Sequence, residues 1–202
     1  MNSPILASRC PIEAVVIGAS AGGVDALMAI LPGLPPTFGL PIVVVLHLPE
    51  GRQSLLAHIF GLRLSLPVRE ASDKESIAPA TVYFAPPGYH LSVEADCSFS
   101  LSCEAPVHFS RPSIDLLMES AADAYGPALA GILLTGANFD GAAGLAKIKE
   151  RGGYTIVQNP AQAQVATMPE AALRQHTPDL ILDLKDIRSL LPQLEKLHHV
   201  QR

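Results

Sequence analysis

Three side chains that together could cleave an ester or an amide follow three apolar stretches of this sequence. Ser20 lies in a Gly-x-Ser-x-Gly turn, His47 comes directly after one apolar run, and Asp140 comes a few residues after another. A serine, a histidine and a carboxylate in contact can serve as nucleophile, base and orienting acid. Because the carboxyl ends of parallel strands meet at one edge of a sheet, we expect these side chains to lie close together. The pattern indicates a serine hydrolase with a Ser-His-Asp triad.

The stretch around Ser20 has the pattern of a buried strand, a tight turn and a helix. Val15, Val16 and Ile17 are β-branched, and apolar residues recur at helical spacing over 24–31. Glycines on both sides of the serine permit a sharp bend and leave its hydroxyl unshielded. The first N–H groups of the following helix point toward the same place and can stabilise negative charge. This is a suitable position for a nucleophile.

The same turn, taken alone, fits a phosphate or dinucleotide cradle equally well. Two features favour the nucleophile. Ser20 stands where the dinucleotide fingerprint has a glycine, and the next strand leads to His47 instead of an acidic residue. A P-loop is excluded, because no Gly-Lys-Ser or Gly-Lys-Thr follows the turn.

Each of the three side chains also has a purely structural explanation. Ser20 is small enough for any tight turn, and His47 could be a hydrogen-bonded histidine at a strand end. Asp140 with Gly141 is a common turn pair that can cap a helix. The order Ser, His, Asp differs from the Ser, Asp, His order of α/β-hydrolases, which also have several strands before the nucleophile, whereas only about 14 residues precede it here. The sequence is therefore not that of an ordinary α/β-hydrolase.

The composition is that of one globular domain without a nucleic-acid partner. The chain has 202 residues, of which 49% are hydrophobic and 16% charged. We expect a single domain over residues 12–200 behind a short N-terminal lead at 1–11. The net charge of −5 and the lack of any run of Lys or Arg give no basis for nucleic-acid binding.

The sequence predicts neither membrane insertion nor secretion nor a metal site. Apolar runs such as 40–46 fall far short of the roughly 18 residues of a membrane helix, and residues 1–11 lack the features of a signal peptide. Cys10, Cys97 and Cys103 have no C-x-x-C spacing, so we expect reduced thiols in the core. We therefore expect a cytoplasmic protein without a metal and without membrane insertion.

Strands alternate with helices through most of the chain, which predicts a doubly wound, mainly parallel α/β sheet flanked by helices. Ser113 is expected to cap one helix, with Asp115 in its first turn, and Pro192 to kink the last helix or mark its late start. The predicted strands are 15–17, 42–46, 129–134, 154–158 and 180–184, the predicted helices are 24–31, 54–60, 113–125, 142–151, 169–175 and 186–198, and a turn is predicted at 48–51.

The region 68–107 departs from this alternation. Short alternating runs at 82–84, 90–93 and 99–101 are separated by turn-forming residues. This pattern favours short strands and a hairpin, which we expect as a small antiparallel addition to the sheet.

Six segments, in order along the chain, resemble the catalytic domain of the chemotaxis protein-glutamate methylesterase family. The resemblance runs from about residue 13 to the last predicted strand. The matching segments are Val-Ile-Gly-Ala-Ser-Ala-Gly-Gly at 16–23, His-Leu-Pro at 47–49, Tyr-Phe-Ala-Pro-Pro-Gly-Tyr-His-Leu at 83–91, Arg-Pro-Ser-Ile-Asp at 111–115, Leu-Thr-Gly through Asp-Gly at 134–141, and Gln-Asn through Met-Pro at 158–169.

The resemblance implies a doubly wound fold and hydrolysis of glutamate γ-methyl esters on the cytoplasmic helices of chemoreceptors, with release of methanol. It also implies the related deamidation of receptor glutamines. Matched position by position, Ser20 is the nucleophile, His47 the base and Asp140 the third member of the triad. The implied partner is a methylated chemoreceptor or a related protein substrate, and neither a metal nor an organic cofactor is implied.

Two alanines depart from the family pattern near the expected oxyanion site. Ala137 stands where the family usually has the methionine of a Gly-Met-Gly stretch, and Ala21 stands where a threonine commonly follows the serine. Both residues belong to the expected oxyanion and substrate-positioning region. A backbone N–H survives either substitution, so we expect a modest loss of activity.

The resemblance also bears on regulation and on alternative functions. Family members usually carry an N-terminal receiver domain that blocks the site until it is phosphorylated, and residues 1–11 are too few to encode one. A separate regulatory protein is therefore an expected partner. Two other functions stay open at this point: a non-catalytic interaction module that keeps the fold, and an esterase of this fold with a substrate outside chemotaxis.

Overall fold

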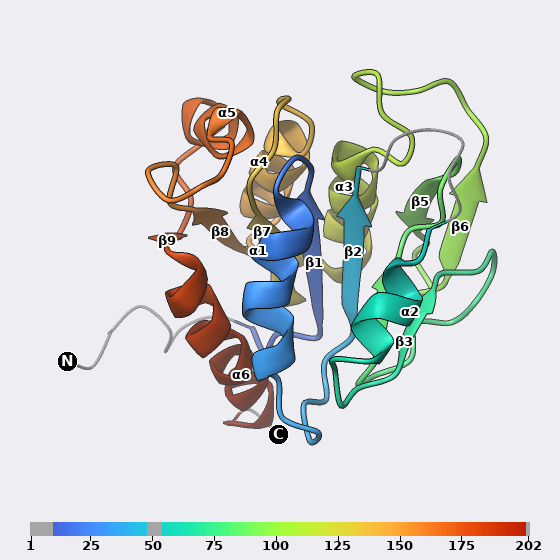
Figure 1. The fold of residues 1–202 in the computed structure, drawn as a ribbon. Coiled ribbons are helices and arrows are strands. Elements are labelled where there is room, and N and C mark those ends of the chain that lie inside the picture. Colours follow the sequence, from blue (N-terminus) through green and yellow to red (C-terminus); the bar gives the residue numbers. More distant parts are fainter. Residues whose placement is uncertain (1–9, 48–53, 201–202) are drawn as a thin grey trace.

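A computed structural model describes residues 10–47 and 54–200, and it describes side chains as far as residue 194. Within these ranges the chain forms a parallel sheet with helices on both faces (Figure 1), which confirms the predicted doubly wound α/β class. Most of the expected N-terminal lead and the expected turn at 48–51 lie outside the described residues.

The five inner strands of the main sheet are short, fully buried and mostly apolar runs, whereas its two edge strands are only partly buried. Its seven strands lie in the order β3-β4-β2-β1-β7-β8-β9, and all neighbours within it run parallel. Continuous apolar runs suit such strands because helices cover both faces. The strands are β1 Ala14–Ala19, β2 Ile42–Leu46, β3 Val68–Glu70, β4 Val82–Phe84, β7 Leu129–Leu133, β8 Tyr154–Gln158 and β9 Leu180–Leu182.

Two layers of helices bury the two faces of the sheet. Successive side chains of β1 alternate between two apolar cores, with Val15 and Ile17 in one and Val16 in the other. The first core is covered by α1 Gly23–Ile30, α2 Leu56–Gly61 and α6 Leu184–Val200, and the second by α3 Ile114–Tyr125, α4 Ala142–Glu150 and α5 Thr167–Gln175. Two short 3₁₀ helices, η1 Leu31–Gly33 and η2 Gly126–Ala128, precede β2 and β7.

The predicted hairpin is present, but it does not extend the main sheet. Strands β5 His90–Val93 and β6 Phe99–Ser102 pair antiparallel as a sheet of their own and pack beside α3. The run 82–84, which the sequence grouped with the hairpin, is instead the parallel strand β4 between β2 and β3. All three of its residues are buried, so this strand takes an inner position in the sheet.

Smaller expectations concerned the helix boundaries, the cysteines and membrane insertion. Ser113 caps α3 by accepting a hydrogen bond from the Leu116 N–H, as predicted, and Pro192 lies inside α6, which begins at Leu184. The cysteines are unpaired, but Cys10 and Cys103 are exposed, so the prediction that they lie in the core was wrong. None of the described helices has the length and apolar character needed to cross a membrane.

Candidate functional site

The three predicted site residues follow three neighbouring central strands. Ser20 follows β1, His47 follows β2, and Asp140 lies in the loop between β7 and α4. In the sheet, β1 lies between β2 and β7, so the chain leaves β1 to one side and later returns to its other side. Such a switch point opens a crevice at the carboxyl ends of the strands, which form the upper edge of the sheet in Figure 1.

The turn that carries Ser20 is fixed by backbone hydrogen bonds. The Ser20 N–H donates to the Thr135 carbonyl at 2.9 Å, and the Ser20 carbonyl accepts from the Gly23 N–H at 2.8 Å. Gly22, the residue before α1, has a φ of 79°, which a side chain would disfavour. The hydroxyl of Ser20 therefore sits on a tight strand-to-helix turn, and the residue is half-buried.

His47 is oriented by a hydrogen bond to the carboxylate of Asp140. The distance from His47 Nε2 to Asp140 Oδ2 is 2.9 Å, and 11% of the His47 side chain is exposed. Because an ionised carboxylate only accepts hydrogen bonds, Nε2 carries the proton of the neutral ring. The lone pair is then on Nδ1, which is the atom able to take a proton from a hydroxyl group.

The carboxylate of Asp140 is fully buried at the N-terminus of α3. Besides His47, it accepts hydrogen bonds from the Ser113 hydroxyl at 2.9 Å, the Ile114 N–H at 2.8 Å and the Asp115 N–H at 3.0 Å. Burial alone would raise the pKa of Asp140. The hydrogen bonds from His47 and from the two backbone N–H groups outweigh burial and hold the pKa below its usual value. Asp140 is therefore ionised at neutral pH, as an orienting acid must be.

Close packing of the starts of α3 and α4 brings Asp140 to this position. Gly141 has a φ of 93°, and a side chain there would collide with Ile114 and Leu133. The bare backbone at Gly141 lets the loop after β7 lie directly against the first turn of α3. The sequence analysis also considered the Asp-Gly pair as a common turn. In the structure, this pair is required for the contact between the loop after β7 and the first turn of α3.

A second buried carboxylate, Asp115, lies beside Asp140 and accepts N–H groups at the start of α4. Its Oδ1 is 2.9 Å from the Gly141 N and 2.7 Å from the Gly144 N. Burial, followed by the negative charge of Asp140, raises the pKa of Asp115 to about 6, although the Gly144 N–H acts in the opposite direction. Asp115 Oδ2 lies 3.5 Å from Nε2 of His108.

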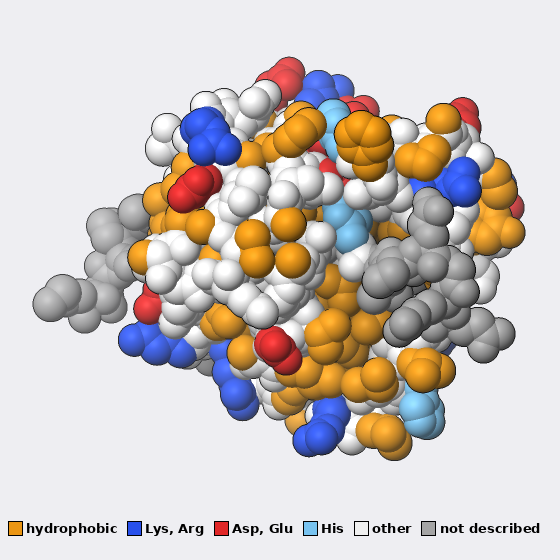
Figure 2. Space-filling view, turned by 45° about the horizontal axis from the view of Figure 1, so that its top comes forward, with side chains coloured by type: hydrophobic (Ala, Val, Ile, Leu, Met, Phe, Trp, Pro, Cys, Tyr) orange, Lys and Arg blue, Asp and Glu red, His pale blue; other side chains and the backbone are white. Residues whose placement is uncertain are grey.

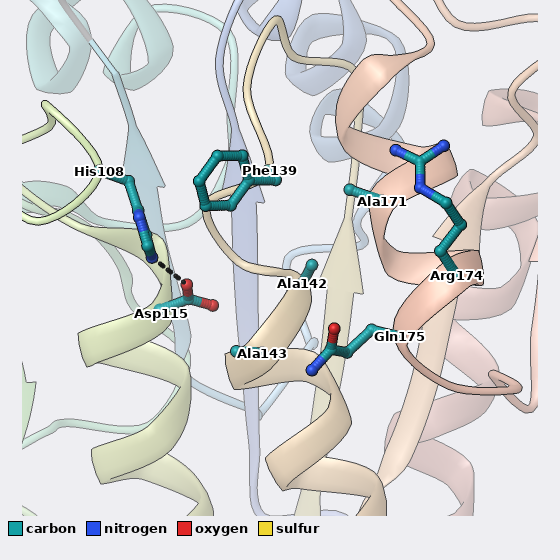
Figure 3. A pocket seen from close by; sticks show the side chains of 8 residues that line it. All are labelled: His108, Asp115, Phe139, Ala142, Ala143, Ala171, Arg174 and Gln175. Atoms are coloured by element: carbon teal, nitrogen blue, oxygen red, sulfur yellow. Dashed lines mark ion pairs between the residues drawn. The ribbon is translucent and has the colours of Figure 1, made fainter.

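A cavity of about 450 Å³ opens next to this second carboxylate. Figure 3 shows His108 and Asp115 on one side of it, Phe139 above, and Arg174 and Gln175 on α5 opposite. The rings of His108 and Phe139 meet edge to face with their centroids 4.5 Å apart. The cavity therefore borders the loop that carries Asp140.

Two polar residues that the sequence did not assign to the site lie near His47, one in contact with its ring and the other in contact with the first. The Oγ of Ser110 is 3.4 Å from His47 Nδ1, and Asn138 Nδ2 is 3.4 Å from the same Oγ. Asn138 follows Ala137 in the stretch that departs from the family's Gly-Met-Gly pattern. Ser110 gave no signal, because a lone serine in a loop 63 positions from His47 has no local pattern.

Two parts of the predicted site make no hydrogen bond in the part of the chain that the structure describes: the Ser20 hydroxyl with His47, and the expected oxyanion-binding N–H groups. Among the described residues, no hydrogen bond joins the Ser20 hydroxyl to His47, and none engages the backbone N–H of Ala21 or Ala137. Ala21 and Ala137 are exposed, and they lie in the loops after β1 and β7. Their N–H groups are therefore available to a substrate oxygen.

The face that carries these strand ends is mostly uncharged. Figure 2 shows histidine side chains near its centre among apolar and uncharged groups, with most charged side chains toward the edges. Within the described part of the chain, no cluster of three or more His, Cys, Asp or Glu side chains has a metal-binding arrangement.

Comparisons with known proteins point to one family. A family model described as CheB methylesterase matches residues 15–191. The chain is 46% identical over 190 residues to a putative protein-glutamate methylesterase/protein-glutamine glutaminase of Leptospira interrogans, covering 94% of this chain and 98% of that protein. It is 44% identical over 168 residues to protein-glutamate methylesterase/protein-glutamine glutaminase 1 of Carboxydothermus hydrogenoformans, covering 80% of this chain and 49% of that protein. The crystal structure of the Thermotoga maritima CheB methylesterase catalytic domain superposes with a TM-score of 0.86 at 34% identity, covering 92% of this chain and 100% of that domain.

Proposed function

This chain belongs to the CheB methylesterase family, and we propose that it hydrolyses protein glutamate methyl esters with Ser20 as nucleophile, His47 as base and Asp140 as orienting acid. The observation that carries the proposal is the 2.9 Å hydrogen bond from His47 to a buried, ionised Asp140 beside the strand end that bears Ser20. That bond leaves the basic lone pair on Nδ1. Residues 12–200 form the catalytic domain in this proposal.

The proposed reaction proceeds through an acyl-enzyme. The Ser20 hydroxyl attacks the ester carbonyl and gives its proton to His47 Nδ1, while Asp140 stabilises the resulting imidazolium. The backbone N–H groups of Ala21 and Ala137, which have no partner among the described residues, stabilise the oxyanion. His47 then returns the proton to the departing methanol. Water, activated by the same base, hydrolyses the acyl-enzyme to free glutamate and restores Ser20.

The same steps accommodate deamidation of glutamine, because ammonia replaces methanol as the leaving group and no other atom of the cycle changes. The proposed substrate is a methylated cytoplasmic region of a chemoreceptor, which places the reaction in the cytoplasm. The mostly uncharged face around the strand ends suits a protein substrate better than a highly charged small molecule (Figure 2). A separate regulatory protein is the remaining proposed partner.

The decisive experiment measures methanol release from a methyl-labelled receptor cytoplasmic fragment by the wild type, Ser20→Ala and Ser189→Ala. Ser189 is exposed on the outer face of α6, where its hydroxyl donates to the Lys185 carbonyl, so it is a matched serine control. We expect the loss of Ser20 to lower the rate by about 10⁴ or more, as in triads that act as a unit. A few-fold loss would refute the role of Ser20. Binding of the fragment without cleavage by the wild type would instead indicate a non-catalytic module.

A further inference from the structure

His47, Asp140, Asn138 and Ser110 form a closed ring of hydrogen bonds. The Asp140 N–H donates to Asn138 Oδ1 at 3.3 Å, and Asn138 Nδ2 donates to Ser110 Oγ at 3.4 Å. Ser110 Oγ lies 3.4 Å from His47 Nδ1, and His47 Nε2 lies 2.9 Å from Asp140 Oδ2. The ring begins and ends at Asp140, once through its backbone and once through its side chain.

The direction of every bond in this ring follows from the chemistry of its members. The Asp140 carboxylate can only accept, so His47 donates through Nε2 and keeps a lone pair on Nδ1. The only proton of the Ser110 hydroxyl then points at that lone pair. Ser110 Oγ is left to accept from the Asn138 amide, whose carbonyl end is already held by the Asp140 N–H. Each of the four bonds therefore has a defined donor and acceptor, and the Asn138 side chain has one orientation.

We propose that Ser110 occupies the basic lone pair of His47 in the substrate-free protein and must withdraw before Ser20 can give up its proton. This inference rests on the proposed function, in which His47 Nδ1 is the base. Ser110 acts through His47, so it is a positioning residue and not a catalytic one. It holds the place at Nδ1 that the Ser20 hydroxyl takes during the reaction, which accounts for the missing contact between Ser20 and His47 among the described residues.

The lengths of the bonds suit a contact that forms and breaks. The 3.4 Å contact to Ser110 is long for an O–H···N bond, whereas the 2.9 Å contact to Asp140 is of ordinary length. Asp140 already fixes the plane of the imidazole ring. Ser110 is therefore not needed to orient His47, and its withdrawal frees the lone pair without releasing the ring.

Ser110 is carried by a turn that can move without disturbing the core. Val107 and Ser110 form a pair of backbone hydrogen bonds at 3.1 and 2.9 Å, and the two residues between them, His108 and Phe109, have φ values of 49° and 61°. Two left-handed residues in a row define a tight type I′ turn, a conformation that neither side chain favours. Phe109 at its tip is fully exposed, and the turn meets the loop after β7 through the His108 ring on Phe139 and the hydrogen bond from Asn138 to Ser110.

The test compares Ser110→Ala with the matched control Ser189→Ala in two measurements. The first is the ¹⁵N chemical shift of His47 Nδ1, which reports a hydrogen bond to the lone pair and needs no turnover. The second is the rate at which Ser20 is acylated by a methyl-ester substrate or labelled by a serine-directed phosphonate. In Ser110→Ala we expect the Nδ1 resonance to move toward that of a free lone pair and the rate to rise about two- to fivefold, the effect of one weak hydrogen bond.

The outcomes distinguish a failure of the inference about Ser110 from a failure of the proposed function. An unchanged Nδ1 resonance, or a rate that stays the same or falls in Ser110→Ala, would overturn the inference. Asn138→Ala should give the same changes in smaller degree, because it removes only the support of Ser110. Hydrolysis that persists in Ser20→Ala would refute the proposed function instead, and the Nδ1 resonance would then still report whether Ser110 occupies the lone pair.

Discussion

One buried aspartate carboxylate lies at the N-terminus of α3 and another at the N-terminus of α4. Each carboxylate belongs to a residue of the other helix or of the loop that precedes it. Asp140 precedes α4 in the chain, but its carboxylate lies at the first turn of α3 and accepts N–H groups of Ile114 and Asp115. Asp115 belongs to α3, but its carboxylate accepts the N–H groups of Gly141 and Gly144 at the start of α4. The two helices thus exchange caps.

The two carboxylates nevertheless have opposite pKa shifts. Burial acts on both, but hydrogen bonds from His47 and two backbone N–H groups lower the pKa of Asp140. Asp115 has a half-exposed histidine at 3.5 Å instead of a close one, and it lies beside the charge of Asp140, so its pKa rises to about 6. A buried helix N-terminus is therefore not enough to keep a carboxylate charged. The close contact with His47 makes the difference, and four changes test this comparison.

The largest expected effect separates the two aspartates by activity. In Asp140→Asn the amide can donate to His47 Nε2, which favours the tautomer with the proton on Nδ1 and removes the base. We expect methanol release to fall by about 10⁴, as in serine proteases with the same change. Asp115→Asn, which leaves the His47 contact intact, should lose less than about tenfold. Equal losses in the two variants would show that Asp140 has no special role.

Stability should also depend on Asp140. Asp140→Ala leaves the Ser113 hydroxyl and the N–H groups of Ile114 and Asp115 buried without their acceptor. Because each buried donor without a partner costs roughly 1 to 3 kcal/mol, we expect the free energy of unfolding to fall by about 3 kcal/mol after partial relaxation. Urea unfolding measures this, with Asp140→Asn as the milder variant that keeps one acceptor. A loss below about 1 kcal/mol would mean that water or another group replaces the carboxylate.

The pH dependence of stability should carry opposite signs for the two groups. Asp115 has a pKa of about 6 in the folded protein against its ordinary value of 3.8, so the folded state binds more protons between these values. The free energy of unfolding therefore falls as the pH rises from about 4 to 6, by an amount on the order of 1 to 3 kcal/mol. Asp140 has a lowered pKa, so its contribution is present above about pH 4 and is lost at lower pH.

The measurement is urea unfolding of the wild type and Asp115→Asn from pH 4 to pH 7. The difference between the two proteins should change over the window set by Asp115, because the variant cannot ionise there. A constant difference would contradict the raised pKa.

The smallest effect is expected at the histidine beside Asp115. The His108 side chain is 37% exposed and lies 3.5 Å from the carboxylate. Because His108 is open to solvent and its contact with the buried Asp115 is long, the pair contributes little, so His108→Ala should lower the free energy of unfolding by less than about 1 kcal/mol. Thermal or urea unfolding checks this value. A loss of 2 kcal/mol or more would show that His108 is a strong partner of Asp115 and would contradict the contrast with Asp140.

Much of the fold was predictable because the central strands are continuous, mostly apolar runs of five or six residues. The predicted bounds 42–46 and 154–158 agree with β2 and β8, and the Ser113 cap was identified from its position before an amphipathic stretch. The run 82–84 was misplaced because three apolar residues fit a hairpin strand or an inner parallel strand equally well. The strand is parallel because it pairs with β2 and β3, and the local sequence does not indicate which strands it will pair with.

The candidate site divides in the same way. His47 and Asp140 could be selected because each follows a strand, and the strand order brings their side chains together. The part of Ser20 stays a prediction. Ser110 could not be selected, since its place at His47 depends on the turn after β6. The second cap, Asp115, was recognised as a first-turn acid, but its contact with α4 depends on how two helices pack.

The position of β7 beside β1 also has a consequence for the order in which the molecule is assembled. The nucleophile and base candidates are made early in synthesis, whereas Asp140 is 93 residues beyond His47. A nascent chain that ends before β7 carries Ser20 and His47 but has neither the acid nor the strand that adjoins β1 on that side. If the proposed triad is the active one, esterase competence is thus tied to completion of the sheet centre, and a partly synthesised chain lacks it.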